Sequence, residues 1–116
     1  MKRMTGFSPR VQAVIAERSG EVCEIQVDCG GAAAVQFHHR RPRGSGGSSL
    51  EWVNMPTNAL HVCEACHRWV ESNRAQARWM GWLVPLNGCS VSAGVRVKYR
   101  CESWVVLDDD GGVTPC

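Results

Sequence analysis

The spacing of apolar positions near the N-terminus predicts one amphipathic helix. Val11, Val14 and Ile15 recur at helical spacing, which places their side chains on one face. A Ser-Pro pair precedes them, as is typical of a capping hydroxyl followed by a first-turn proline. Gly20 stands where such a helix stops. We therefore expect a short helix that ends at Gly20 and buries its apolar face.

The middle of the chain predicts a strand, a loop, a return segment and a helix, in that order. Residues 33–39 run apolar into two histidines, which predicts a strand with the histidines at its end. The following RRPRGSGGSS has no apolar side chain and predicts an exposed loop. Residues 52–57 would be the return segment. Residues 58–81 contain a helix in which Val70 and Ala77 recur at helical spacing.

Beyond residue 83 the helical periodicity gives way to alternation. The segment SAGVRVKYR alternates small or apolar with polar residues, and ESWVVLDDDGGV offers a second apolar run. This pattern predicts two strands of a hairpin. We find no internal repeat and expect one domain over residues 1–116, with a core module at about 22–80 and a hairpin extension at about 83–113.

Charge is unevenly distributed along the chain. Thirteen basic and eleven acidic side chains give a net charge of +2, which does not by itself indicate a nucleic-acid partner. Three of the acidic residues are the consecutive Asp108, Asp109 and Asp110, so the rest of the chain carries +5. A basic body permits a phosphate-binding face, although a merely solvated surface has the same composition. An acidic run near a terminus is usually solvated, so we expect no metal there.

Seven cysteines indicate either disulfides or bound metal. The N-terminal MKRMTGFSPR has no apolar core of a signal peptide. No segment approaches the roughly 18 apolar residues of a membrane helix. We therefore expect a cytoplasmic protein, in whose reducing surroundings clustered cysteines favour metal over disulfides. The odd total leaves at least one thiol unpaired within the chain in any case.

The pair Cys63 and Cys66 is the strongest single signal, because a two-residue gap lets both thiolates reach one tetrahedral zinc. A redox dithiol is the competing interpretation, and it would follow a strand at the start of a helix. Cys23 and Cys29 would complete the site, although five residues separate them and a larger loop must close. We predict a four-cysteine structural zinc; the alternative is that some of these are small buried apolar side chains. No role is assigned to Cys89, Cys101 and Cys116.

Four further polar residues surround the zinc pair in an ordered way. His38 and His39 end the predicted strand, Asn58 follows the loop, and His67 directly follows the CxxC. Together, FHHRRPRG, the Gly/Ser loop, PTNALHVCEACH and the helix after it resemble the HNH endonucleases, also called ββα-metal nucleases, over about residues 22–73. The whole chain is also similar to small HNH proteins of tailed bacteriophages, including its LDDDGG segment.

The resemblance implies a fold and a set of roles. The fold is α+β, with a ββα-metal core at about residues 22–80 stapled by the four-cysteine zinc site, an N-terminal helix and a C-terminal β-hairpin. His39 falls where the family places its general base. Asn58 matches the middle residue, which orients the base or approaches the metal. His38 falls at a metal-ligand position that is commonly Asp, and His67 matches the last ligand.

Elementary chemistry supports these roles. A neutral imidazole accepts a proton near neutral pH, so His39 is a suitable base for water. One divalent cation would polarise the scissile phosphate and stabilise the leaving 3′ oxygen. With two imidazoles as ligands the site is softer than a carboxylate site, so Mn²⁺ or Ni²⁺ is expected to support activity at least as well as Mg²⁺.

The arginines after the predicted base are the expected DNA contacts. Arg40, Arg41 and Arg43 could neutralise phosphates on either side of the cut, whereas the alternative is a solvated basic loop. Glu71 is expected to pair with an arginine outside the site. The five tryptophans are expected in the core or at an interface and not as platforms on which nucleic-acid bases stack.

These inferences favour a metal-dependent endonuclease that hydrolyses DNA phosphodiester bonds in the host cytoplasm. It would be phage-encoded, with DNA and packaging (terminase) proteins as partners and no membrane. Mobile-element or restriction chemistry is equally compatible with the residues. The alternative is a non-catalytic zinc module that recognises DNA or a protein, for which the four polar residues would be superfluous. A redox protein using Cys63 and Cys66 is a third hypothesis, which stoichiometric zinc would exclude.

Overall fold

The computed structural model describes residues 6–27, 29–42, 51–85 and 92–116 as a mixed α+β protein. Its helices are α1 (Pro9–Ser19), α2 (Glu64–Ser72) and α3 (Arg74–Trp79), with short 3-10 helices η1 (Glu51–Asn54), η2 (Pro56–Asn58) and η3 (Ser92–Gly94). Its strands are β1 (Gln36–His39), β2 (Ala59–Val62), β3 (Val97–Tyr99), β4 (Ser103–Leu107) and β5 (Val113–Pro115).

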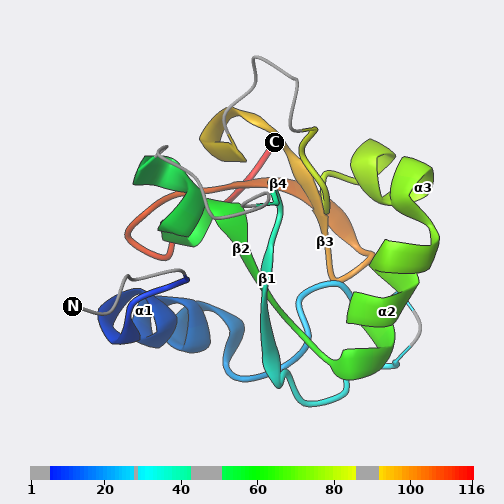
Figure 1. The fold of residues 1–116 in the computed structure, drawn as a ribbon, viewed down its shortest axis with the longest axis horizontal. Coiled ribbons are helices and arrows are strands. Elements are labelled where there is room, and N and C mark those ends of the chain that lie inside the picture. Colours follow the sequence, from blue (N-terminus) through cyan, green and yellow to red (C-terminus); the bar gives the residue numbers. More distant parts are fainter. Residues whose placement is uncertain (1–5, 28, 43–50, 86–91) are drawn as a thin grey trace.

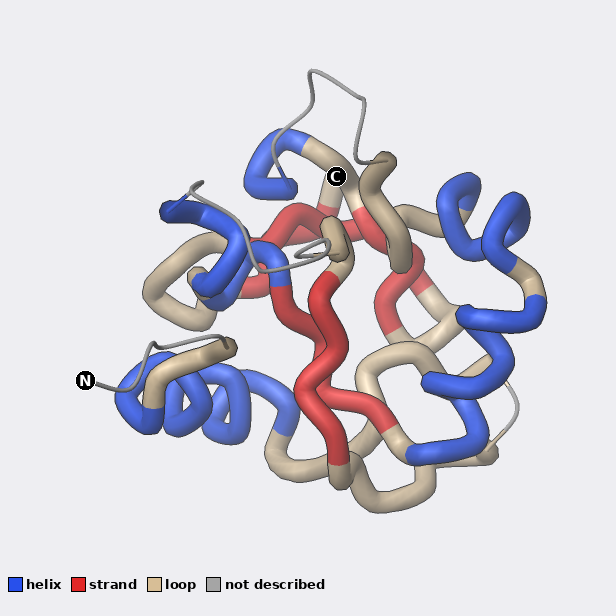
Figure 2. Tube along the Cα trace, in the orientation of Figure 1, coloured by secondary structure: helices blue, strands red, loops and turns tan. Residues whose placement is uncertain are grey.

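Two antiparallel sheets organise these elements. Strand β1 pairs with β2, with Gln36 opposite Val62 and His39 opposite Ala59. The second sheet has the order β3-β4-β5. Helix α1 lies on one side of the β1–β2 pair, and α2 and α3 lie on the other (Figure 1). Loops and short helices surround the strands at the centre of the molecule (Figure 2).

One apolar core joins both sheets to α2 and α3. Its buried side chains are Cys23, Ile25, Leu60, Val62, Cys63, Cys66, Val70, Ala77, Trp82, Leu83, Val97, Val105 and Leu107. A smaller cluster of Phe7, Ile15 and Ala59 lies beneath α1. The four cysteines of the predicted zinc site belong to or pack against the larger core.

The N-terminal helix has the boundaries that its sequence predicts. The Ser8 side chain accepts the backbone N–H of Val11 at 3.2 Å. Gly20 adopts a left-handed conformation, with φ of 62°, and its N–H donates to Ala16. Both signals are local, because a capping hydroxyl and a left-handed glycine act on the adjacent helical turn. Ile15 is buried, whereas Val11 and Val14 are half-buried.

The return segment and the long helix differ from expectation. Residues 52–57 lie in η1 and η2 or between them, and the strand that pairs with β1 comes later, as β2. The predicted helix is divided at Asn73, whose backbone leaves helical geometry and whose side chain donates to Trp69 O at 2.9 Å. Side-chain amides of this kind compete with the helical backbone for its carbonyls.

The C-terminal hairpin is extended by a third strand. Strands β3 and β4 form the expected hairpin, and β5 pairs with β4. Asp108 organises the β4–β5 turn, because its Oδ1 accepts the N–H groups of Asp110 and Gly112 at 2.8 Å each. Asp109 Oδ1 accepts the N–H of Thr57 at 3.2 Å. Two members of the acidic run therefore shape the turn and attach it to η2.

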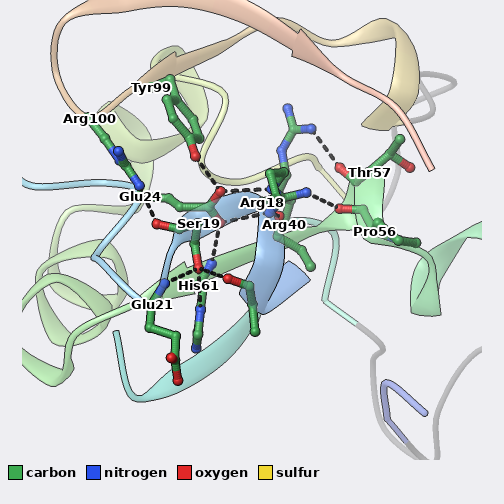
Figure 3. A network of polar contacts seen from close by, with 12 residues as sticks. Arg18, Ser19, Glu21, Glu24, Arg40, Pro56, Thr57, His61, Tyr99 and Arg100 are labelled. Atoms are coloured by element: carbon green, nitrogen blue, oxygen red, sulfur yellow. Dashed lines mark hydrogen bonds and ion pairs between the residues drawn. The ribbon is translucent and has the colours of Figure 1, made fainter. Parts of the chain in front are cut away.

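A buried ion pair ties α1 to the rest of the fold (Figure 3). The side chains of Arg18 and Glu24 are both 0% exposed and form two hydrogen bonds of 2.7 Å. Glu24 also accepts from Tyr99 Oη and from the His61 N–H, both at 2.7 Å. Burial, reinforced by the Glu24 charge, raises the pKa of Tyr99 above its ordinary value. Four donors on one carboxylate provide the compensation that a buried charge requires.

Gly81 is a position at which the fold tolerates no side chain. Its φ is +77°, and a β-carbon there would lie 2.1 Å from the backbone oxygen of Arg96. We expect Gly81→Ala to lower the free energy of unfolding by about 2 kcal/mol or more, combining left-handed strain with a backbone clash. Denaturant unfolding of the two proteins measures this. The equivalent change at Gly30, which has φ of +61° and open space, carries only the strain.

Candidate metal centre and histidine pocket

Four cysteines converge on one point of the core. The sulfur atoms of Cys23, Cys29, Cys63 and Cys66 all lie within 4.8 Å of one another. Tetrahedral zinc with bonds of about 2.3 Å needs sulfurs roughly 3.8 Å apart. Within the described residues this is the one group of three or more metal-ligating side chains at such separations. The donor set fits a structural ion such as zinc.

Local backbone geometry prepares two of the thiols as ligands. Cys63 caps α2, and its Sγ accepts the N–H of Cys66 at 3.4 Å. The Sγ of Cys23 accepts the N–H of Gln26 at the same distance. These N–H donors hold the two sulfur atoms at fixed positions in the cluster. Cys63 thus occupies the strand-to-helix junction that a redox dithiol would use. The sulfurs of Cys23 and Cys29 beside it are what distinguishes a four-cysteine metal site from a redox dithiol.

The wide spacing of Cys23 and Cys29 has a structural cause. The residues between them carry Glu24 and Ile25 into the core, where both are fully buried. Burial of the Cys29 thiol opposes its ionisation, but N–H groups of Ala32 and Gly31 and the neighbouring thiols lower the pKa of Cys29 to about 7. Burial raises the pKa of Cys63. The longer segment between Cys23 and Cys29 therefore provides Glu24 for the buried ion pair, and the four sulfur atoms still lie close together.

A second feature is an open depression of about 230 Å³ beside β1 and α2. Its lining is Phe37, His38, His39, Pro42, His67, Glu71 and Leu83. The three histidines that we predicted to form a site thus share one concavity. Asn58 does not line it.

His38 and His67 face each other with one nitrogen of each ring anchored. Their ring centroids are 5.3 Å apart. His38 Nε2 lies 2.8 Å from the backbone oxygen of Trp82, which can only accept, so Nε2 carries the proton. His67 Nδ1 lies 2.7 Å from Gln36 Oε1. Lone pairs therefore remain on Nδ1 of His38 and Nε2 of His67, an arrangement typical of metal-binding histidines.

The His38 ring is neutral over the physiological range. Burial lowers its pKa to about 4, although the bond to Trp82 opposes the shift. A neutral imidazole is the form that binds metal ions.

His39 contacts a different part of the fold. Successive strand residues point to opposite faces, so His38 meets α2 whereas His39 meets the segment before α1. The Phe7 ring stacks on His39 at a centroid distance of 4.0 Å and an angle of 12°. His39 Nε2 lies 2.9 Å from Asn54 Oδ1. Sequence reasoning missed both Phe7 and Asn54, because no local pattern relates them to His39.

Asn58 positions the loop that leaves β1. Its side chain is buried, and its Oδ1 accepts the Arg41 N–H at 2.8 Å while its Nδ2 donates to the Arg41 O at 3.1 Å. It also bonds Val53 O and Ser92 Oγ. Asn58 therefore fixes the backbone two residues beyond His39, so any effect on His39 is indirect.

The three predicted DNA-binding arginines lie in different environments. Arg40 is 0% exposed and donates to the backbone oxygens of Gly81, Thr57, Ser92 and Val95 at 2.8 to 3.1 Å. Its guanidinium is therefore committed to the fold and does not face solvent. Arg41 is half-buried, with its guanidinium 5.5 Å from the Trp52 ring centroid. Arg43 lies outside the described residues.

Glu71 enters the site although we expected it outside. It lines the depression with His67, which precedes it by one helical turn on α2. It also pairs with Arg74 at 2.8 Å, as predicted. The four-residue spacing to His67 was the signal available in the sequence.

Comparison of the chain with protein-family models, with characterised proteins and with solved structures finds no match. Among the described helices, none combines the length and apolar character required to cross a membrane. The structure itself shows a mixed α+β protein with a four-cysteine cluster that could bind a metal ion.

Proposed function

We propose that this protein is a metal-dependent endonuclease of the HNH type that hydrolyses DNA phosphodiester bonds. The observation that carries the proposal is the meeting of His38, His39, His67 and Glu71 around one open depression. Three of these four have the roles that the resemblance to HNH nucleases assigns. A purely structural zinc module has no need of histidines gathered outside its cysteine cluster.

The pocket contains donors for one divalent ion. Nδ1 of His38 and Nε2 of His67 would bind it, and Glu71 would add a carboxylate oxygen by leaving Arg74. When bound, such an ion supplies charge stabilisation for the scissile phosphate and the departing oxygen. Gln36 and Trp82 hold the two rings in the required tautomers, so they act as positioning residues.

His39 would take the proton from the attacking water. Its bond with Asn54 Oδ1 fixes the orientation of the ring and the nitrogen that carries the proton. Stacking on Phe7 restricts rotation of the ring. A restrained imidazole loses little entropy on reaching the reacting geometry.

Arg41 is the described arginine that best fits a phosphate contact. It follows β1 and has no ion-pair partner among the residues that the structure describes. Its stacking on Trp52 leaves guanidinium N–H groups for an anion. Arg43 remains a predicted DNA contact, whereas the burial of Arg40 assigns it to the scaffold. A phage origin, a host-cytoplasm location and packaging proteins as partners remain part of the proposal, on the resemblance alone.

Metal preference tests the proposed donor set. Supercoiled plasmid is incubated with the zinc-loaded protein and Mn²⁺, Ni²⁺, Mg²⁺ or EDTA. We expect nicking with Mn²⁺ or Ni²⁺ at least as fast as with Mg²⁺, because two imidazoles favour the softer ions, and none with EDTA. His38→Ala and His67→Ala should each abolish it, with Arg68→Ala on the exposed side of α2 as control. A strict Mg²⁺ requirement would contradict the two-histidine site, and DNA binding without cleavage under every metal would favour a non-catalytic zinc module.

A further inference from the structure

The outer face of the β3-β4-β5 sheet carries a row of cations and aromatic rings. Val97 and Val105 are buried against the core. Because strand residues alternate between faces, Lys98 and Trp104 point outward as a directly opposed pair. Arg96 precedes β3 on the same side as Lys98. We call Trp79, Arg96, Lys98 and Trp104 the aromatic-basic patch.

The patch is held together by ring contacts. The Arg96 guanidinium lies 4.2 Å from the Trp104 ring centroid, and the Lys98 ammonium lies 5.4 Å from it. The Trp79 ring, at the end of α3, lies 5.9 Å from that of Trp104. The Lys98 N–H donates to Met80 O at 2.9 Å, which fixes the strand against the end of α3.

Trp79 is unusual in its exposure. Its side chain is 73% exposed, and in the described part of the chain Val35 is the other large apolar side chain that is strongly exposed. Exposed single apolar residues are common, but an indole beside two cations offers both a stacking surface and a charge.

The two cations are not neutralised within the described residues. The ion pairs there involve Arg18, Arg68 and Arg74, whereas the side chains of Arg96 and Lys98 lie over the Trp104 ring. A guanidinium that stacks on a ring keeps its N–H edge for an anion. The patch therefore presents two oriented positive charges next to an exposed indole.

We propose that the aromatic-basic patch binds single-stranded nucleic acid. Arg96 and Lys98 would contact successive phosphates, and Trp79 would stack on an unpaired base, the combination that single-strand binding surfaces use. The phosphates of a duplex could also contact the two cations. A duplex offers no base to the Trp79 indole, however, because its bases are already stacked on each other. This site is separate from the histidine pocket, and it stands whether or not that pocket cleaves DNA.

Binding is measured by fluorescence polarisation of a labelled oligothymidylate, without added divalent metal so that no cleavage intervenes. We expect Trp79→Ala to weaken binding roughly tenfold. The double variant Arg96→Ala/Lys98→Ala should reduce the slope of log affinity against log salt by about 1.4, the value for two phosphate contacts on a single strand. The matched control is Arg68→Ala/Arg74→Ala, which removes the same charge from exposed, ion-paired positions.

Several outcomes would overturn the proposal. Equal weakening by the control pair would mean that net charge alone binds the strand. Unchanged affinity of a folded Trp79→Ala protein would contradict the stacking contact. Trp79→Phe, which keeps an aromatic ring, and Val35→Ala, which changes the other exposed apolar side chain, are measured for comparison. Tighter binding of a duplex than of the oligothymidylate, or binding of anionic vesicles alone, would contradict single-strand recognition. Competition with an oligouridylate shows whether the patch prefers single-stranded RNA or single-stranded DNA, and a preference for either one supports the proposal.

Discussion

Replacing His39 with alanine is expected to slow plasmid nicking by about 10²- to 10⁴-fold, the range that a positioned general base contributes. The reason is that neither of the other two histidines that line the depression is placed to replace His39 as the base. Each of the three rings has one nitrogen on a neighbouring acceptor, but we assign His38 and His67 to the metal and His39, which also stacks on Phe7, to the role of base. The measurement is the initial nicking rate with Mn²⁺ at fixed zinc content.

A loss of activity could also follow from disturbed packing, because His39 stacks on Phe7. Exogenous imidazole separates the two causes: it should restore part of the rate in His39→Ala if the ring acts as a base. Asn54→Ala provides a second test. This variant keeps the His39 ring but removes the acceptor that fixes its tautomer. We therefore expect a smaller loss of nicking rate, about tenfold, which added imidazole does not restore. Full activity of a folded His39→Ala protein would remove His39 from the proposed mechanism.

Removing the metal from the cysteine cluster is expected to unfold much of the protein. Structural zinc contributes about 10 kcal/mol or more in small domains, comparable to the whole stability of about 5–15 kcal/mol of a typical protein. The cluster here lies in the larger core, with Cys23, Cys63 and Cys66 buried. We expect one zinc per chain, and loss of the cooperative thermal transition when a strong chelator removes it.

Cys66→Ser tests the same cluster without a chelator. It should lower bound zinc and greatly reduce the free energy of unfolding, because one ligand of four is weakened and a buried thiolate is lost. Cys101→Ser and Cys116→Ser are the matched controls, since both thiols are exposed and neither belongs to the cluster. A folded protein without zinc, or with reactive thiols at Cys63 and Cys66, would instead support redox chemistry.

The two sites are linked through α2. Cys63 caps this helix and Cys66 lies in its first turn, and His67 follows directly. A metal bound by the cysteines would therefore hold the helix that carries His67 and Glu71 to the depression. Loss of zinc should accordingly abolish the proposed nuclease activity even before the protein unfolds completely.

The sequence by itself determined the features that depend on short segments. The limits of α1 follow from Ser8 and Gly20, which act within one helical turn. The CxxC signal located two of the four sulfurs correctly, and the alternation beyond residue 83 predicted the β3–β4 hairpin. In each case the controlling residues are adjacent, so their chemistry can be inferred before any tertiary contact is known.

Only the tertiary structure decided which polar residues are buried and which strands pair. Arg40 stands in a polar, arginine-rich run, yet four backbone acceptors from three distant segments enclose its guanidinium. The position of β2 depends on its register with β1, which local propensity does not specify. Asn54 and Phe7 reach His39 through the packing of η1 and the N-terminal segment. Burial and register are set by contacts between distant residues, and a single sequence does not contain that information in any local pattern.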